Sequence, residues 1–382
     1  ADNLHLGMGY QSPYRHYALP VTGLDFNVDQ DTGAIAKDLL SRIYDKLKAT
    51  ETEDTDGKTN DTKAAYLAEL ENTKTLITST DVKKTAEYKQ ALESILSKHL
   101  ALEVDKTGLK NAKEALNTLA TEADPTAGKT ADSAKTYTDA KTAAQQAIQV
   151  AQTVIDNTDA TVAQVKEALN KVNEKKAALE AAKQALVEAA TTEEKAKLKT
   201  DADSLVKADT NGKTPNSIEA YNTKYEELKA QLEAAKTEAA TVLAKADNAS
   251  KAEVQAAQTK VEAAKAELTK AAELLVNKAD KAELTKAKEA LNTLATEADP
   301  TTGKTADSAK TYNDAKTAAQ EAIQAAQTVI DNTDATVAQV KEALNKVNEK
   351  KAALEAAKQA LVEAVTPVGK EKALEAIQTA SE

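Results

Sequence analysis

One long segment of this sequence occurs twice. Residues 112–189 recur as residues 287–364, and the copies differ at only four positions: Ala127/Thr302, Thr138/Asn313, Gln146/Glu321 and Val150/Ala325. Near-identical tandem copies are typical of stacked supersecondary units, which set a length or multiply a surface. A catalytic site is not expected in such duplicate form. The repeat therefore predicts a modular architecture.

Each copy contains three runs with helical periodicity. In the first copy they cover 109–123, about 132–157 and about 162–186. Pro125 and Gly128 interrupt the chain between the first two runs, and Asp132 or Ser133 is the expected cap of the second helix. Apolar and small residues recur at steps of three and four, which places them on one helix face. Three such helices joined by short loops predict an antiparallel three-helix bundle.

A shorter signature extends the repeat to the whole chain. The tripeptide Gly-Lys-Thr, followed by Ser/Thr-x-x-x-Tyr, occurs at Gly57, Gly128, Gly212 and Gly303. We therefore predict an all-α fold, a tandem array of three-helix bundles forming an elongated rod. The predicted bundles cover 30–104, which is diverged, 105–190, 191–276 and 277–365, with an irregular arm at 1–29 and the start of a further helix at 366–382.

The joints between units leave two alternatives. Gly108 interrupts the first joint, so bending is predicted near 104–109. Residues 161–211 and 251–299 contain no Gly or Pro, which favours third helices that continue into the next unit, with stiff or only kinked helical junctions around 188–195 and 276–283. Two segments that resemble capping boxes, Thr191-x-x-Glu194 and Asp280-x-x-Glu283, favour fresh helix starts instead.

Composition excludes several classes of function. The 382 residues include no cysteine, so disulfides, thiol nucleophiles and thiolate metal sites are impossible within them. A net charge of −11 with mixed signs argues against a nucleic-acid partner. No apolar run reaches the length of a membrane span, and no signal peptide is visible. Cores rich in alanine are thin, so deep ligand pockets and cofactors are not expected, and the chain is predicted to be a monomer.

Motifs that suggest chemistry lack their required context. A phosphate loop needs a Gly five residues before Gly-Lys-Thr, where Thr52, Ala123, Lys207 and Ala298 stand. Asp54, Asp56 and Asp61 surround Gly57, but a calcium loop in this register would need acids where the sequence has Thr52 and Lys63. The three histidines, His5, His16 and His99, are too scattered for a metal site. No catalytic, cofactor-binding or metal-binding residues are predicted, and the chain is not expected to be an enzyme.

The arm at 1–29 differs from the rest in its aromatic, Gly and Pro content. Residues 19–23 match the sortase pentapeptide only in their five letters, because a soluble chain follows them. The best candidate ligand contact, to carbohydrate or protein, is Tyr14, Arg15, His16 and Tyr17. The alternative is that the arm's aromatic residues pack at the edge of a core, against the first bundle or an upstream domain of the same polypeptide.

The repeat consensus resembles a known family. A Leu-x-x-Leu helix, a polar loop, Ser-x-x-x-Tyr, an Ala-rich helix ending in Val-Ile-x-Asn and an Ala-Thr start before a Leu-rich helix are similar to the FIVAR repeat. The residues that carry the resemblance are Leu116, Leu119, Ser133, Tyr137, Ala151, Val154, Ile155, Asn157, Ala160, Thr161, Val165, Leu169 and Leu179. It is good for units two to four and weaker for unit one, and it does not cover 1–29.

The resemblance implies an extracellular location. FIVAR repeats occur in large surface proteins of Gram-positive bacteria, including matrix-binding adhesins and the stalks of cell-wall-anchored glycoside hydrolases. The expected function is a non-enzymatic stalk that projects a head domain from a bacterial cell wall. The alternative is a multivalent adhesion module that binds host extracellular-matrix protein or glycan through repeated bundle faces.

Overall fold

A computed structural model describes residues 31–365 and 367–381. The predicted arm at 1–29 lies outside the described residues. Over the described residues the chain is almost entirely helical, with short loops, so the predicted all-α class is confirmed. The chain divides into two compact units, Ala1–Ala190 and Thr191–Glu382.

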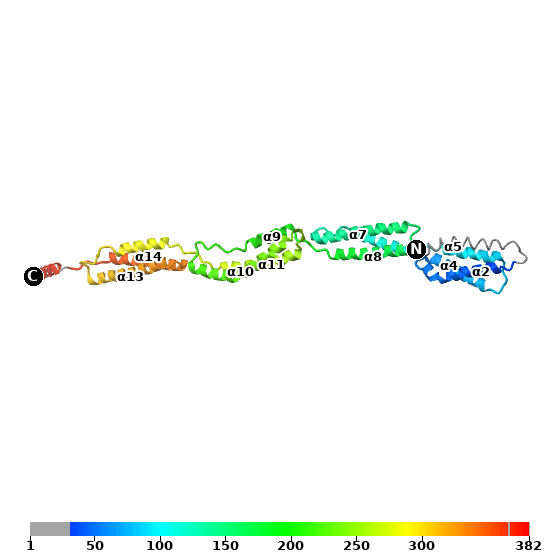
Figure 1. Ribbon diagram of the computed structural model, residues 1–382. Helices are drawn as coiled ribbons and strands as arrows, with labels where there is room; N and C mark the ends of the chain where they lie inside the picture. Colours follow the sequence, from blue (N-terminus) through cyan, green and yellow to red (C-terminus); the bar gives the residue numbers. More distant parts are fainter. Residues whose placement is uncertain (1–30, 366, 382) are drawn as a thin grey trace. The chain divides into compact units, whose positions relative to one another are not determined.

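The first unit contains two groups of packed helices (Figure 1). Bundle 1 comprises α2 (Ala34–Ala49), the short α3 (Glu51–Thr55), α4 (Asn60–Thr78) and α5 (Thr85–Leu100). Bundle 2 comprises α6 (Thr107–Ala120), α7 (Ala131–Asp156) and α8 (Val162–Gln184). In each bundle the three long helices all pack on one another.

The second unit repeats this arrangement. Bundle 3 comprises α9 (Thr192–Asp203), α10 (Pro215–Ala244), the 3-10 turn η2 (Ala246–Asn248) and α11 (Lys251–Ala272). Bundle 4 comprises α12 (Ala282–Ala295), α13 (Ala306–Asp331) and α14 (Val337–Gln359). A further helix, α15 (Pro367–Ser381), follows, and its side chains Leu374 and Ile377 are 58% and 65% exposed.

The core of bundle 2 follows the predicted apolar stripes. Its large buried side chains include Leu116, Tyr137, Val172 and Leu179, and alanines fill the remaining positions along the helix contacts. A buried alanine contributes roughly one methyl group, about 0.8 kcal/mol, so much of the stabilisation comes from a few large side chains. The four differences between the twin segments all lie at exposed positions in bundle 2, so bundles 2 and 4 share the same core.

The third helices do not continue into the next unit. The helix α8 ends at Gln184 and α9 begins at Thr192, while α11 ends at Ala272 and α12 begins at Ala282. Of the two alternatives, the structure therefore shows fresh helix starts, although helix propensity also allowed continuous helices. The reason is that the residues after each third helix form backbone hydrogen bonds with a loop of their own bundle, as described below.

The predicted start signals had mixed outcomes. Thr191 forms the capping box with Glu194, as predicted. Asp280 does not cap α12 through such a box. Its carboxylate instead accepts a hydrogen bond from the backbone N–H of Ala282, two residues on, in an Asx-type turn. Gly108 does not interrupt the first joint, because it is the second residue of α6.

Candidate functional site

The predicted ligand contact cannot be placed. Tyr14, Arg15, His16 and Tyr17 all lie outside the described residues. The features that recur in the described part of the chain are the Gly-Lys-Thr loops, so the site is built from these.

Each Gly-Lys-Thr loop holds the chain segment that leaves its bundle. In bundle 2 the backbone N–H of Thr130 donates to the carbonyl of Val187 at 2.8 Å, and the N–H of Ala189 donates to the carbonyl of Gly128 at 2.9 Å. The two segments form a single antiparallel bridge, Lys129 with Glu188. We call this pairing the exit latch. It explains why α8 cannot run on, because residues 187–189 are extended.

The exit latch occurs in all four bundles. Its antiparallel bridges join Lys58 to Val104, Lys129 to Glu188, Lys213 to Asn277 and Lys304 to Glu363. The glycine of each loop has a φ between +70° and +75°. This left-handed conformation strains any residue with a Cβ, which explains why all four loops contain Gly. The tripeptide is therefore a structural connector, as predicted.

The threonine of the tripeptide occupies the N-cap position of the second helix, and this corrects the sequence prediction. Thr130, and not Asp132 or Ser133, is the N-cap residue of α7. Ser133 completes the latch instead: its hydroxyl accepts a hydrogen bond from Thr130 Oγ1 at 2.8 Å and from the N–H of Val187 at 3.2 Å. The Thr-x-x-Ser spacing is thus needed to join the helix start to the exit segment.

A lysine holds the opposite end of each twin bundle. Lys106 immediately precedes α6, and its Nζ donates to the carbonyls of Ile155 and Asn157 at 2.9 and 2.8 Å. These carbonyls stand at the C-terminus of α7, where the helix dipole favours a cation. Lys281 makes the same contacts in bundle 4. The resemblance did not single out these lysines, although each precedes the first helix of its bundle.

Bundle 1 contains a buried polar cluster. His99 Nε2 lies 3.0 Å from Asp54 Oδ2, with only 2% and 3% of the two side chains exposed. Thr50 Oγ1 also donates to Asp54 at 2.7 Å, and the ring of Tyr66 contacts His99 edge-on. Burial lowers the pKa of His99, although the hydrogen bond with Asp54 opposes this. Burial also lowers the pKa of the nearby Lys58.

This cluster joins α3 to α5 in the interior of bundle 1. A histidine–aspartate pair resembles part of a nucleophilic triad, but both groups are covered by the bundle and cannot reach a substrate. Asp54 and Asp56, which flank Gly57, contact His99 and Lys166 respectively. Within residues 31–365 and 367–381 no group of three or more His, Cys, Asp or Glu residues could hold a metal.

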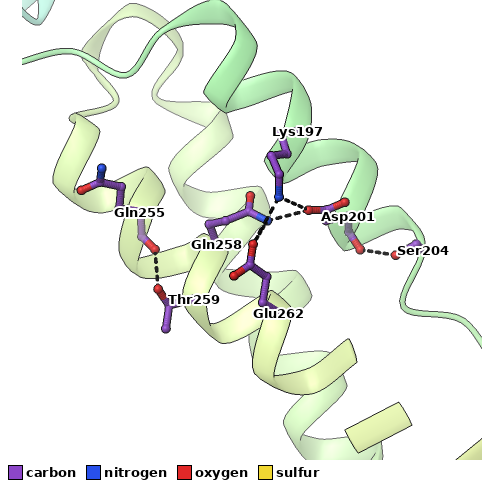
Figure 2. A network of polar contacts seen from close by, with 7 residues as sticks. All are labelled: Lys197, Asp201, Ser204, Gln255, Gln258, Thr259 and Glu262. Carbon is purple, nitrogen blue, oxygen red and sulfur yellow. Dashed lines mark hydrogen bonds and ion pairs between the residues drawn. The ribbon is translucent and has the colours of Figure 1, made fainter. Parts of the chain in front are cut away.

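Bundle 3 contains a polar network between α9 and α11, shown in Figure 2. Gln258 Nε2 donates to Asp201 at 2.6 Å, and Lys197 donates to both Asp201 and Glu262 at 2.8 and 3.2 Å. The hydrogen bond from Lys197 lowers the pKa of Asp201. Residues at the same places in bundle 2 are Ala112 and Leu169, which pack against its core. Bundle 3 thus replaces an apolar helix contact with a polar one.

A shallow open depression lies on α10. Asn216, Glu219, Thr223, Glu227 and Leu274 contribute to its lining. Because it is open and carries charged groups, it is unsuited to enclosing a small apolar molecule.

Comparison with known proteins agrees with this geometry. Residues 112–180, 202–269 and 271–355 match the FIVAR domain, and together they make up more than half of the chain. These matches fall on bundles 2, 3 and 4, where the resemblance was good.

The chain is also similar to much longer proteins. It is 34% identical over 264 residues to the extracellular matrix-binding protein EbhB of Staphylococcus aureus strain N315, covering 69% of this chain and 7% of that protein. The same identity and share of this chain relate it to the extracellular matrix-binding protein ebh of strain JH9, of which it covers 2%. The chain thus spans less than a tenth of the length of these relatives.

One solved structure is similar in sequence. It is described as "Characterization of extracellular matrix binding protein- (Embp)-mediated Staphylococcus epidermidis adherence to fibronectin". The similarity covers 43% of this chain and 98% of that chain at 32% identity, with a TM-score of 0.25. The FIVAR matches, which carry the assignment, confirm the resemblance predicted from the sequence, and the chain belongs to the FIVAR domain family.

Proposed function

We propose that this chain is a non-enzymatic extracellular spacer that projects a head domain from a bacterial cell wall. The observation that carries the proposal is that the chain enters and leaves a bundle at opposite ends. In bundle 2, Lys106 binds the C-terminal end of α7, whereas the exit latch joins the N-terminal end of α7. The 26 residues of α7 span about 39 Å at 1.5 Å per residue. A bundle of this kind therefore adds about one helix length to the chain's path.

Both ends are also held by hydrogen bonds, which suits a spacer. The latch and the lysine contact fix the first and last residues of a bundle, so only the few residues between these contacts are free where the next bundle begins. No helix among the described residues is long and apolar enough to cross a bilayer. Under this proposal, attachment to the cell wall and the head domain belong to other parts of a longer polypeptide.

A second function is favoured by a different observation. Over residues 112–189 and 287–364, bundles 2 and 4 share exposed residues as well as buried ones, apart from the four substitutions. The relatives are named as extracellular matrix-binding proteins. Nearly identical surfaces at two places suit a module that binds a repetitive host ligand weakly per bundle and more tightly by avidity.

The two functions are separated by binding measurements at different valency. Immobilised fibronectin, other matrix proteins and a glycan array should be tested against the full chain and against segments with one, two and three bundles. A spacer gives no binding at any valency, whereas an adhesion module gives affinity that rises steeply with bundle number. In both cases folding of each segment is checked by its helical circular dichroism.

A further inference from the structure

The linker between bundles 1 and 2 is hydrogen-bonded to both bundles, and no residue lies between the two bonded residues. The N–H of Asp105 donates to the carbonyl of Gly57 in bundle 1, and the next residue, Lys106, binds the end of α7 in bundle 2. In the linker between bundles 3 and 4, the corresponding bonds are made by Lys278 and Lys281. Two residues, 279 and 280, stand between them. The first linker is therefore shorter by two residues.

Val104 joins the first linker to both bundles. Its backbone forms the bridge with Lys58 of bundle 1, while its side chain packs against the core of bundle 2. In the linker between bundles 3 and 4 these two roles fall to separate residues: Asn277 forms the bridge with Lys213, and the smaller Ala279 packs against the core of bundle 4. Because the backbone of Val104 is bonded to bundle 1 while its side chain packs on bundle 2, moving the bundles apart would expose this side chain to water.

A second apolar contact lies across the same joint. A Cβ at Gly57 would lie 2.5 Å from Cγ1 of Val162, so the first residue of α8 packs directly on the Gly57 backbone. Val337 is the same residue in bundle 4, and 66% of it is exposed. Since the twin segments are nearly identical, this difference comes from the neighbouring bundle and not from the local sequence.

The polar contacts across the two joints differ as well. Lys166 donates to Asp56 at 2.9 Å across the first joint, but both side chains are about 60% exposed, and such pairs are weak. Between bundles 3 and 4, Asp334 accepts one hydrogen bond from the backbone N–H of Asn216 at 2.7 Å. The first joint therefore combines apolar packing with a salt bridge.

We propose that bundles 1 and 2 are locked into one rigid body by Val104 and by the contact of Val162 with Gly57, whereas the joint between bundles 3 and 4 bends. This reverses the bending that Gly108 suggested for residues 104–109. The inference concerns mechanics, and it stands whether the chain acts as a spacer or as an adhesin.

Pulsed spin-label distance measurements on the full chain test the proposal. The absence of native cysteine allows specific labelling. One label pair, K74C with E114C, spans the first joint, and the matched pair, K229C with E289C, spans the joint between bundles 3 and 4. All four positions are exposed. We expect a narrow distance distribution for the first pair and a broader one for the second.

Variants then assign the difference to its contacts. V162S/K166E should broaden the distribution across the first joint towards that of the second, while the helical circular dichroism stays unchanged. The matched control V337S/K341E should leave the second distribution as it is. Equal widths in the parent chain, or no broadening in V162S/K166E, would overturn the proposal.

Discussion

In bundles 1 and 2, a side chain near the end of the third helix binds a carboxylate that follows the first helix, but the two contacts differ in chemistry and burial. Counting from the exit latch, His99 of bundle 1 and Lys183 of bundle 2 occupy the same place. Lys183 binds Glu122 at 2.6 Å with both side chains at least 40% exposed, whereas His99 and Asp54 are almost completely buried. The fold therefore accepts either a His–Asp or a Lys–Glu contact at this place. How much the contact stabilises the bundle depends on how deeply it is buried.

The largest expected effect comes from breaking the buried pair. His99→Leu removes the ring that binds the buried carboxylate of Asp54, which should destabilise bundle 1 by roughly 3–5 kcal/mol. The matched change in bundle 2, Lys183→Ala, removes an exposed pair and should cost about 0–1 kcal/mol. Native-state hydrogen exchange in the full chain measures the protection of α5 and α8 separately. Thermal unfolding of several bundles together does not distinguish them. Similar loss of protection in both helices would contradict the comparison.

Bundle 3 offers a smaller version of the same contrast. Gln258→Leu leaves Asp201 beside an apolar side chain, and this should destabilise bundle 3 by about 1–3 kcal/mol. The double variant D201A/Q258L introduces the residue types of Ala112 and Leu169, which pack against the core of bundle 2, and should recover most of that loss. Urea denaturation followed by NMR signals of α9 and α11 measures both. If the double variant is less stable than Q258L, apolar side chains cannot replace the polar network in bundle 3.

The stability of bundle 1 should depend on pH near neutrality, whereas that of bundle 2 should not. Burial lowers the pKa of His99 below 6.5, so the unfolded state binds a proton more readily than the folded state. Stability is then full above about pH 6.5 and falls as the pH drops, by at most about 1.4 kcal/mol per pH unit, until it levels off below the folded pKa. Asp54, Lys58 and Tyr66 face the ring. The same NMR-detected titration should show no such step for bundle 2, which contains no histidine, and none in H99L.

The smallest effect compares the twin bundles. Thr161 and Thr336 form the same capping box at the start of α8 and α14. Replacing either by Ala should cost about 1 kcal/mol, because one helix-end N–H loses its acceptor. The two losses, measured by hydrogen exchange of the first turns, should be equal if the cap acts alone. A larger loss for T161A would indicate that the cap also positions Val162 on Gly57.

Much of the fold was predictable because helix periodicity, caps and loops depend on residues that are close in sequence. The periodic stripes that contain Tyr137, Val165 and Leu179 predicted the buried faces, and these residues are buried. The Thr191 capping box and the loops at Gly-Lys-Thr were also predicted correctly. These features depend on residues within a few positions of one another, which a single sequence displays directly.

The cap of α7 and the ends of the third helices were not predictable in the same way. Thr130 and Val187 are 57 residues apart, and their pairing exists only after the bundle has formed. Helix propensity alone favoured continuing α8 past Gln184. Tertiary hydrogen bonding outweighs that preference, since the latch satisfies backbone groups on both segments.

By itself, the sequence determined the class of fold, the repeat and the family, because periodicity, turn residues and duplication can be observed directly in the order of the residues. Only the tertiary structure decided how identical segments differ. Val162 and Val337 have the same local sequence, yet one packs on a neighbouring bundle and the other is exposed. His99, too scattered in sequence to suggest a site, became the centre of a buried cluster through a partner 45 residues away. Burial and contact arise between segments, and therefore no window of sequence contains them.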